Sequence, residues 1–90
     1  MVKEKLQPLN ENEELLTDVK VLILHNDDVN SFDFVINALV ELCGHDEHQA
    51  EQCTLIVHYK GKCGVKSGPL DELKPIHTEM TNRKLTVTIK

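Results

Sequence analysis

The sequence predicts a small α+β domain in which three helices pack on one side of a small antiparallel sheet, in the order β-α-α-β-α-β. Three observations carry this prediction. Lys20–His25 is β-branched and mostly apolar, which is typical of a largely buried strand. Phe34–Leu42 carries apolar residues at spacings of three and four, which indicates one helical stripe. Lys84–Ile89 alternates strictly between polar and apolar residues, which predicts a strand with one buried face.

The length of 90 residues corresponds to one domain. Hydrophobic residues make up 40% of the chain but aromatic residues only 3%, so the core must be built from Leu, Val and Ile. Residues 1–17 are polar and without sustained periodicity, so we expect a mobile N-terminal tail there. The folded domain is expected to cover residues 18–90.

The first helix is expected to follow a turn at the end of the first strand. Consecutive Asx residues break the strand at Asn26–Asp28. Either Asn30 or Ser31 can cap the helix that follows. Gly44 is a natural stop, because glycine readily adopts the left-handed conformation that ends many helices.

The second helix is expected to start near Asp46 and to end before Gly61. Its apolar positions are Ala50, Cys53 and one of the pair Ile56 or Val57.

Cys63–Val65 is expected to form a short strand. Ser67–Pro69 then opens a third helix, with proline at the first helical position. Pro75 falls inside that helix, where proline removes a backbone hydrogen bond, so we expect the helix to be short, kinked or late in starting.

The net charge of −5 argues against nucleic acid and anionic membranes as partners, because both attract basic surfaces. No apolar run approaches 18 residues, and the N-terminus lacks the apolar core of a signal peptide. We therefore expect a cytoplasmic protein whose three cysteines remain thiols. An acidic protein can still bind cationic or amine-bearing partners.

Two patterns invite chemical interpretations. The scattered Cys and His residues fit zinc spacing poorly, and no nucleophile motif is visible, so we expect no metal, no cofactor and no catalysis. The run His25–Asp28 is either a polar turn or a cluster of acceptors suited to a metal or an ammonium ion. His58, near the end of the second helix, is either structural or the other half of that site.

Together, these segments resemble the ClpS family, the bacterial and plastid adaptors of the Clp protease. The resemblance rests on His25–Asp28 before a helix, on Val57–Lys62 (Val-His-Tyr-Lys-Gly-Lys) about thirty residues later, and on Cys63–Val65. It runs in order and with similar spacing over residues 19–90. The family recognises proteins that begin with a large hydrophobic residue (an N-degron) and passes them to an AAA+ unfoldase of the ClpA or ClpC type, which feeds the ClpP peptidase.

The resemblance also implies site residues. Asn26, Asp27 and His58 would bind the free α-amine of the substrate. The pocket for the first side chain would be lined by Asp28, Asn30, Phe32, Val35, Thr54, Val57 and Leu85. Phe32 stands where the family has a gatekeeper, usually Met, that excludes β-branched residues, although a large aromatic can equally be a core residue at a helix start. Glu72 and Lys74 would face the unfoldase. We expect a monomer.

Three departures from the family leave alternatives open. Asn30–Phe32 replaces the usual Thr-Pro-Met. Thr54 replaces an apolar residue and should make the pocket slightly more polar. The segment from Cys63 onward is shorter than in many relatives, so we expect a truncated third helix. One alternative is a ClpS-fold interaction module that docks on the unfoldase and modulates it without binding N-degrons. Another is a recognition domain like that of eukaryotic N-end-rule ubiquitin ligases, although those lie within very long chains.

Overall fold

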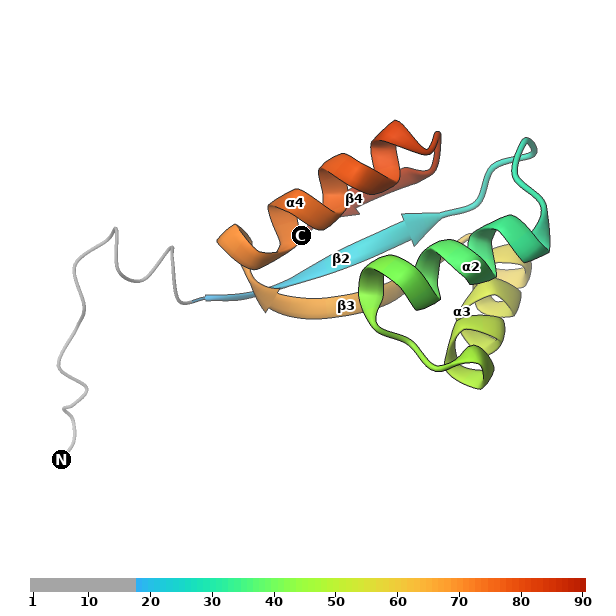
Figure 1. Cartoon of the computed structure of the whole chain (residues 1–90), viewed down its shortest axis with the longest axis horizontal. Helices are drawn as coiled ribbons and strands as arrows, with labels where there is room; N and C mark the ends of the chain where they lie inside the picture. Colours follow the sequence, from blue (N-terminus) through green and yellow to red (C-terminus); the bar gives the residue numbers. More distant parts are fainter. Residues whose placement is uncertain (1–17) are drawn as a thin grey trace, which may run out of the picture.

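A computed structural model describes residues 18–90. The expected tail, residues 1–17, lies outside the described residues. In the described part of the chain, a three-stranded antiparallel sheet of order β3-β2-β4 carries three helices, which confirms the predicted α+β class and element order (Figure 1). None of the helices formed by these residues combines the length and apolar character that crossing a bilayer requires.

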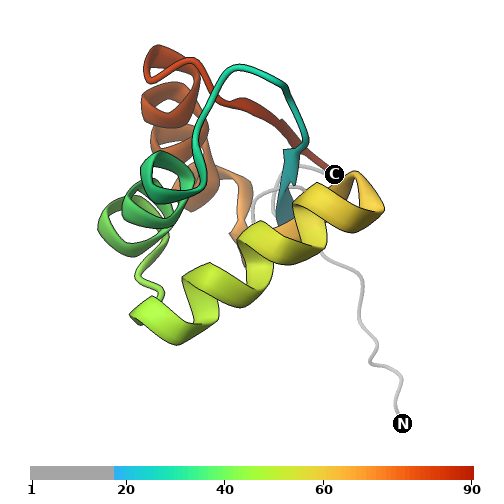
Figure 2. The ribbon, with the colours of Figure 1, turned by 90° about the vertical axis from the view of Figure 1, so that its right-hand side faces the viewer.

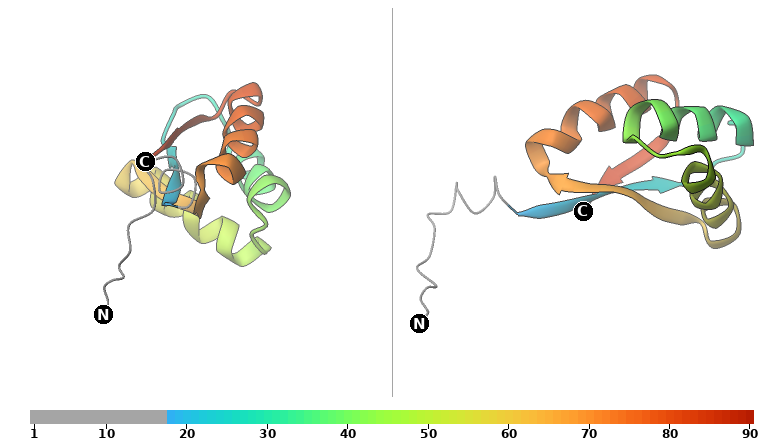
Figure 3. Two further views of the ribbon diagram at one scale, coloured as in Figure 1. Left: turned by 90° about the vertical axis from the view of Figure 1, so that its left-hand side faces the viewer. Right: turned by 60° about the horizontal axis from the view of Figure 1, so that its bottom comes forward.

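The central strand β2 (Val19–His25) gives the domain its core. Its alternate residues Leu22 and Leu24 are buried, and β3 (Lys62–Pro69) and β4 (Thr86–Ile89) pair with it on either side. Helices α2 (Phe32–Cys43) and α4 (Leu70–Asn82) lie over the same face of the sheet, and α3 (Glu47–Lys60) packs against α2 and β3 (Figures 2 and 3). The largest fully buried side chains are Leu22, Leu24, Leu39, Leu73 and Met80. Leu and Val are buried as the composition predicts, but Met80 joins them, and the isoleucines that pack against this core are only partly buried.

The caps of α2 and α3 follow the sequence signals. Of the two candidate caps, Ser31 is the one used: its hydroxyl accepts a hydrogen bond from the amide of Phe34. Asp46 caps α3 through the amide of Gln49. Gly44 and Gly61 end the two helices in the left-handed conformation, which costs a glycine little. On α3 the buried member of the Ile56–Val57 pair is Val57.

The expectation of a short strand at Cys63–Val65 is wrong, because β3 has eight residues. Its polar, glycine-containing sequence has little strand character, and pairing with β2 along its length supplies the missing stabilisation. The register shifts between Leu22 and Ile23, which leaves Val65 as an extra, buried residue on β3. At Gly64 a Cβ atom would lie 2.9 Å from a methyl group of Val21, so this close approach favours glycine.

The expected short or late third helix is also wrong. Pro69 is the N-cap of α4 rather than its first residue, and the helix continues for 13 residues with Pro75 inside it. Pro75 removes the hydrogen bond to the carbonyl of Asp71. Both residues are exposed, so the freed carbonyl lies on a side of the helix that water reaches. The helix therefore tolerates its proline.

The last strand begins at Thr86 rather than at Lys84. Lys84 has φ +70°, and the amide of Leu85 donates to the carbonyl of Met80 at the end of α4. Both residues therefore belong to the turn between α4 and β4 (residues 83–85), called the α4–β4 turn below. The alternation is nevertheless confirmed: Leu85 and Val87 are buried, whereas Thr86 and Thr88 are exposed.

Candidate functional site

A cavity opens where the end of β2, the start of α2, the end of α3 and the α4–β4 turn meet. Its volume is about 50 Å³. Its lining is Leu24, His25, Asn26, Asp27, Asn30, Phe32, Val35, Thr54, Val57, His58 and Leu85. One backbone bond brings the two halves of the site together: the amide of Asn26 donates to the carbonyl of Gly61 at 2.9 Å, which fixes the end of β2 against the end of α3.

The structure brings all three expected amine-binding residues and all expected pocket residues except Asp28 around this one cavity. Asp28 is exposed and lies outside the lining. Leu24 and His25 line the cavity in addition. His25 belongs to the run His25–Asp28 but not to the expected amine-binding set, and its Nε2 lies 2.8 Å from the hydroxyl of Thr88 on β4.

Asp27 is held by its own loop. Its Oδ1 accepts hydrogen bonds from the amides of Val29 at 2.9 Å and Asn30 at 3.0 Å. The carboxamide of Asn30 donates to Oδ1 at 3.2 Å and to Oδ2 at 3.0 Å. Burial raises the pKa of Asp27, but the hydrogen bonds from Asn30 and Val29 outweigh it and lower the pKa below its ordinary value. The cavity therefore contains a fixed negative charge at neutral pH.

His58 lies in the last turn of α3, and its ring makes edge-on contacts with two aromatic neighbours. The ring of Phe32 meets it edge-on at a centroid distance of 5.3 Å, and the ring of Tyr59 does so at 4.9 Å. Phe32 is 41% exposed and lines the cavity, so the alternative of a core residue at the helix start is wrong. Phe32 instead links the start of α2 to the end of α3.

The other walls of the cavity are apolar. Val35 of α2, Val57 of α3 and Leu85 of the α4–β4 turn contribute aliphatic side chains. Thr54 is 3% exposed, and its hydroxyl donates to the carbonyl of Ala50 at 2.8 Å. Because its proton is already used within the helix, Thr54 adds less polarity to the pocket than its residue type suggests.

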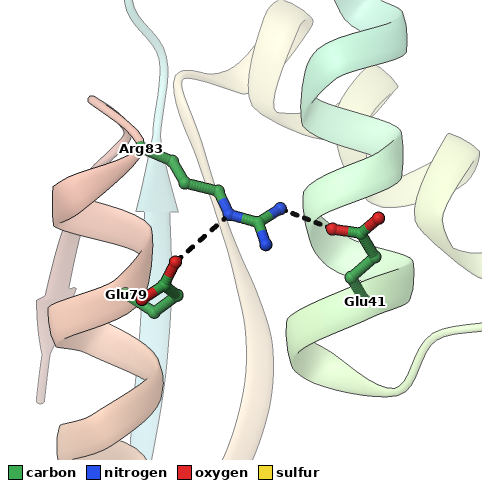
Figure 4. A network of polar contacts seen from close by, with 3 residues as sticks. All are labelled: Glu41, Glu79 and Arg83. Atoms are coloured by element: carbon green, nitrogen blue, oxygen red, sulfur yellow. Dashed lines mark hydrogen bonds and ion pairs between the residues drawn. The ribbon is translucent and has the colours of Figure 1, made fainter.

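The α4–β4 turn is anchored to both neighbouring helices. The guanidinium of Arg83 bonds to Glu41 of α2 at 2.6 Å and lies 3.6 Å from Glu79 of α4 (Figure 4). The next residue, Lys84, accepts a hydrogen bond from the carboxamide of Asn30 through its carbonyl at 3.0 Å. These contacts hold Leu85 in the cavity wall.

The expected unfoldase contacts lie elsewhere. Glu72 and Lys74 are exposed residues of α4, and α4 itself contributes no residue to the cavity. Glu72 lies 4.0 Å from the ammonium group of Lys66 on β3. The structure therefore places the cavity at one end of the sheet and these charged residues of α4 outside it.

The cavity combines a carboxylate and neutral acceptors with aliphatic walls. A carboxylate, an amide oxygen and an imidazole nitrogen can together accept the three N–H donors of an ammonium group. An apolar group attached to that ammonium can be buried against the aliphatic side chains. This arrangement suits a ligand that is cationic at one end and apolar at the other.

The sequence matches the family model ClpS, described as ATP-dependent Clp protease adaptor protein ClpS, over residues 17–88. It is 36% identical over 84 residues to the ATP-dependent Clp protease adapter protein ClpS of Pectobacterium carotovorum subsp. carotovorum (strain PC1), with 91% of this chain and 72% of that protein covered. For the protein of the same name from Serratia proteamaculans (strain 568), the identity is 38% over 65 residues, with 70% and 61% covered.

Among solved structures, the chain resembles the structure of Agrobacterium tumefaciens ClpS2 bound to L-phenylalaninamide. The TM-score is 0.77 at 20% identity, and the match covers 82% of this chain and 96% of that chain. At this identity the likeness establishes the fold alone.

Proposed function

The chain belongs to the ClpS family, the adaptor proteins of the ATP-dependent Clp protease, and we propose that within this role it captures proteins by a free, large hydrophobic N-terminal residue. The observation that carries the proposal is the cavity, in which Asn26, Asp27 and His58 stand beside the aliphatic lining. In this proposal those three residues bind the α-ammonium and the lining receives the first side chain. The protein then acts by binding, and catalysis belongs to its partners.

Selectivity for a true N-terminus follows from hydrogen-bond counting. An α-ammonium has three N–H donors and a positive charge, whereas an acetylated or internal nitrogen has one donor and no charge. Such a nitrogen would leave Asp27 and its neighbouring acceptors partly unpaired. Each buried unpaired acceptor costs about 1–3 kcal/mol, so a blocked terminus is expected to bind far more weakly.

The apolar walls supply the preference for large side chains. Burying a large aliphatic or aromatic side chain contributes about 1.5–3 kcal/mol, and a small one contributes less. The ligand of the structural neighbour, L-phenylalaninamide, is a free amine with an aromatic side chain and thus has the chemistry of such a terminus. This likeness supports the proposal for the present chain.

We further propose that the captured protein is delivered to an AAA+ unfoldase of the ClpA or ClpC type, which works with the ClpP peptidase. Glu72 and Lys74 are the residues that we propose for the contact with this unfoldase. Their separation from the cavity is compatible with simultaneous binding of substrate and unfoldase.

The decisive experiment titrates a short peptide that begins with Leu or Phe against the protein, alongside the same peptide with an acetylated N-terminus. Binding of the free amine alone is the expected result. Equal binding of both peptides, or binding of neither, would instead favour a module that docks on the unfoldase without recognising N-degrons. A peptide beginning with Gly controls for binding that does not involve the first side chain.

A further inference from the structure

The carboxamide of Asn30 bonds to two separate parts of the fold. Its nitrogen donates to the carboxylate of Asp27, at 3.0 Å to Oδ2 and 3.2 Å to Oδ1. The same nitrogen donates to the carbonyl of Lys84 at 3.0 Å, 54 residues along the chain. A carboxamide has two N–H donors, so it can serve both acceptors at once.

The first contact orients the carboxylate of Asp27. Its Oδ1 already accepts from the amides of Val29 and Asn30, and the carboxamide adds a third donor. Its Oδ2 accepts only the carboxamide among the donors of the described residues. A carboxylate oxygen has about two lone-pair sites, so Oδ2 is the oxygen with capacity left for a ligand.

The second contact fixes a wall of the cavity. Lys84 has φ +70°, a conformation that L-residues adopt at some energetic cost and that neighbouring contacts must maintain. Its carbonyl bond to Asn30 and the ion pair of Arg83 with Glu41 hold the turn on both sides. Leu85, which follows directly, lines the cavity. Asn30 thus connects the charged end of the site to one of its apolar walls.

We propose, on the basis of the proposed function, that Asn30 is a positioning residue for capture of the N-terminus. Its carboxamide presents Oδ2 of Asp27 to the substrate ammonium and, through Lys84, holds Leu85 against the first side chain. Asn30 lines the cavity, but its main contribution is the orientation of its two partners rather than apolar contact with the ligand.

The chemistry of the side chain makes this role specific. A serine or threonine hydroxyl has a single proton and can serve Asp27 or Lys84, but not both. An aspartate has the shape of asparagine but no donor, and it would place a second carboxylate against that of Asp27. Substitution by Ser should therefore retain part of the function, and substitution by Asp should retain least.

The pH dependence of binding gives a readout that a purely structural role would not alter. Removing the carboxamide takes away one of the hydrogen bonds that lower the pKa of Asp27, so that pKa should rise. Peptide binding should then fail at a higher pH on the acid side than it does in the wild type. The other titratable groups that line the cavity with this carboxylate are His25 of β2 and His58 of α3. Asp28 is the next residue of the same loop, and Lys84 meets Asn30 through its backbone carbonyl.

The experiment measures the affinity for a Leu-initiated peptide as a function of pH in the wild type, Asn30→Ala, Asn30→Ser and Asp27→Ala. Asn37→Ala is the matched control, because Asn37 is exposed on α2 and outside the cavity. We expect Asn30→Ala to weaken binding about tenfold, Asn30→Ser to weaken it less, and Asn37→Ala to leave it unchanged. In the Asp27→Ala background, Asn30→Ala should cost less than tenfold, because only the contact of Asn30 with Lys84 is then left to lose.

A second measurement follows the carboxyl carbon of Asp27 by NMR during a pH titration of the free protein. Its pKa should be higher in Asn30→Ala than in the wild type or in Asn37→Ala. The positioning role is overturned if Asn30→Ala leaves both this pKa and the affinity unchanged. It is also overturned if the effects of Asn30→Ala and Asp27→Ala on the binding free energy are additive in the double variant. If the wild type itself binds free and acetylated peptides equally, the proposed function fails first and the positioning role fails with it.

Discussion

Replacing Phe32 by Ala should widen the range of N-terminal residues that the cavity accepts while leaving the fold intact. The ring stands at the start of α2, lines the cavity and contacts His58 edge-on at 5.3 Å. A β-branched side chain carries its bulk close to the backbone, where a ring at the mouth obstructs it, whereas Leu and Phe carry theirs farther in. Without the ring, N-terminal Ile and Val should enter.

The magnitude of each effect follows from exposure and contact. Phe32 is 41% exposed, so only a little over half of the ring is removed from water. A fully buried Phe contributes about 1.5–3 kcal/mol, so Phe32→Ala should lower the free energy of unfolding by about 1–2 kcal/mol. One misplaced methyl or methylene is worth about 1–3 kcal/mol in an apolar pocket, so the preference for Leu over Ile should fall about tenfold or more.

The assay compares the affinities of Leu-, Ile- and Val-initiated peptides for the wild type and Phe32→Ala, together with urea denaturation of both. Phe34→Ala is the matched control, because Phe34 lies on the same helix, is 39% exposed and does not line the cavity. It should cost similar stability and leave the preference unchanged. A loss of more than about 3 kcal/mol in Phe32→Ala, with an unchanged ratio of Leu to Ile affinity, is the signature of a core residue and would refute the reasoning.

Four further outcomes can be checked. Asp27→Ala and His58→Ala should each weaken binding of a Leu-initiated peptide by about 1.5–3 kcal/mol in a calorimetric titration, with an unchanged circular dichroism spectrum; unchanged affinity in both would remove the amine-binding assignment. Deleting residues 1–17 should leave peptide affinity intact and slow degradation by the cognate protease, and degradation at the full rate would contradict this. Lys84→Gly should raise the free energy of unfolding by up to about 1 kcal/mol in urea, because glycine adopts φ +70° without strain; a loss of stability would show that other contacts of Lys84 matter more. Burial raises the pKa of the Cys43 thiol to about 11, so iodoacetamide at pH 8 should modify it far more slowly than a free thiol, as followed by mass spectrometry; rapid modification would mean that the core opens.

The charged end of the cavity also ties stability to pH. The pKa of Asp27 is lowered in the folded protein, so the stabilisation that its ionised form provides is present above the pKa of the unfolded chain. This contribution is lost as the pH falls through the lowered folded value. It therefore adds to the effect of acid on peptide binding.

Much of the fold was predictable because its strongest elements carry local signals. The buried face of each of these elements can be read from its own residues: β2 is mostly apolar, α2 carries an apolar stripe, and β4 alternates between polar and apolar residues. Capping is equally local: Asp46 and Gly61 bound α3 through interactions within a few residues. The order of the three motifs was enough to predict the family, which the comparisons confirm.

The misjudged elements are those whose conformation depends on distant partners. β3 has a polar, glycine-containing sequence, and its eight-residue length comes from hydrogen bonding to β2. The helix α4 runs through Pro75 because packing buries Leu73 and Met80 on one side, while the proline lies on the exposed side. Intrinsic propensity predicted a short, kinked or late-starting helix, and the observed length of 13 residues shows that tertiary packing outweighed the local preference.

The residue types of the cavity were readable from the sequence, but their arrangement was not. The run His25–Asp28 and His58 were visible in the sequence as polar residues at the ends of elements, and the resemblance implied that Asn26, Asp27 and His58 bind the α-amine. Only the tertiary structure excludes Asp28 from the lining. It alone joins Asn30 to the carbonyl of Lys84, because the side-chain direction in a loop and the path of a turn 54 residues away are set by the packing of α4 and β4 against β2. Sequence thus determined which groups are available for binding, and long-range packing determined which of them meet.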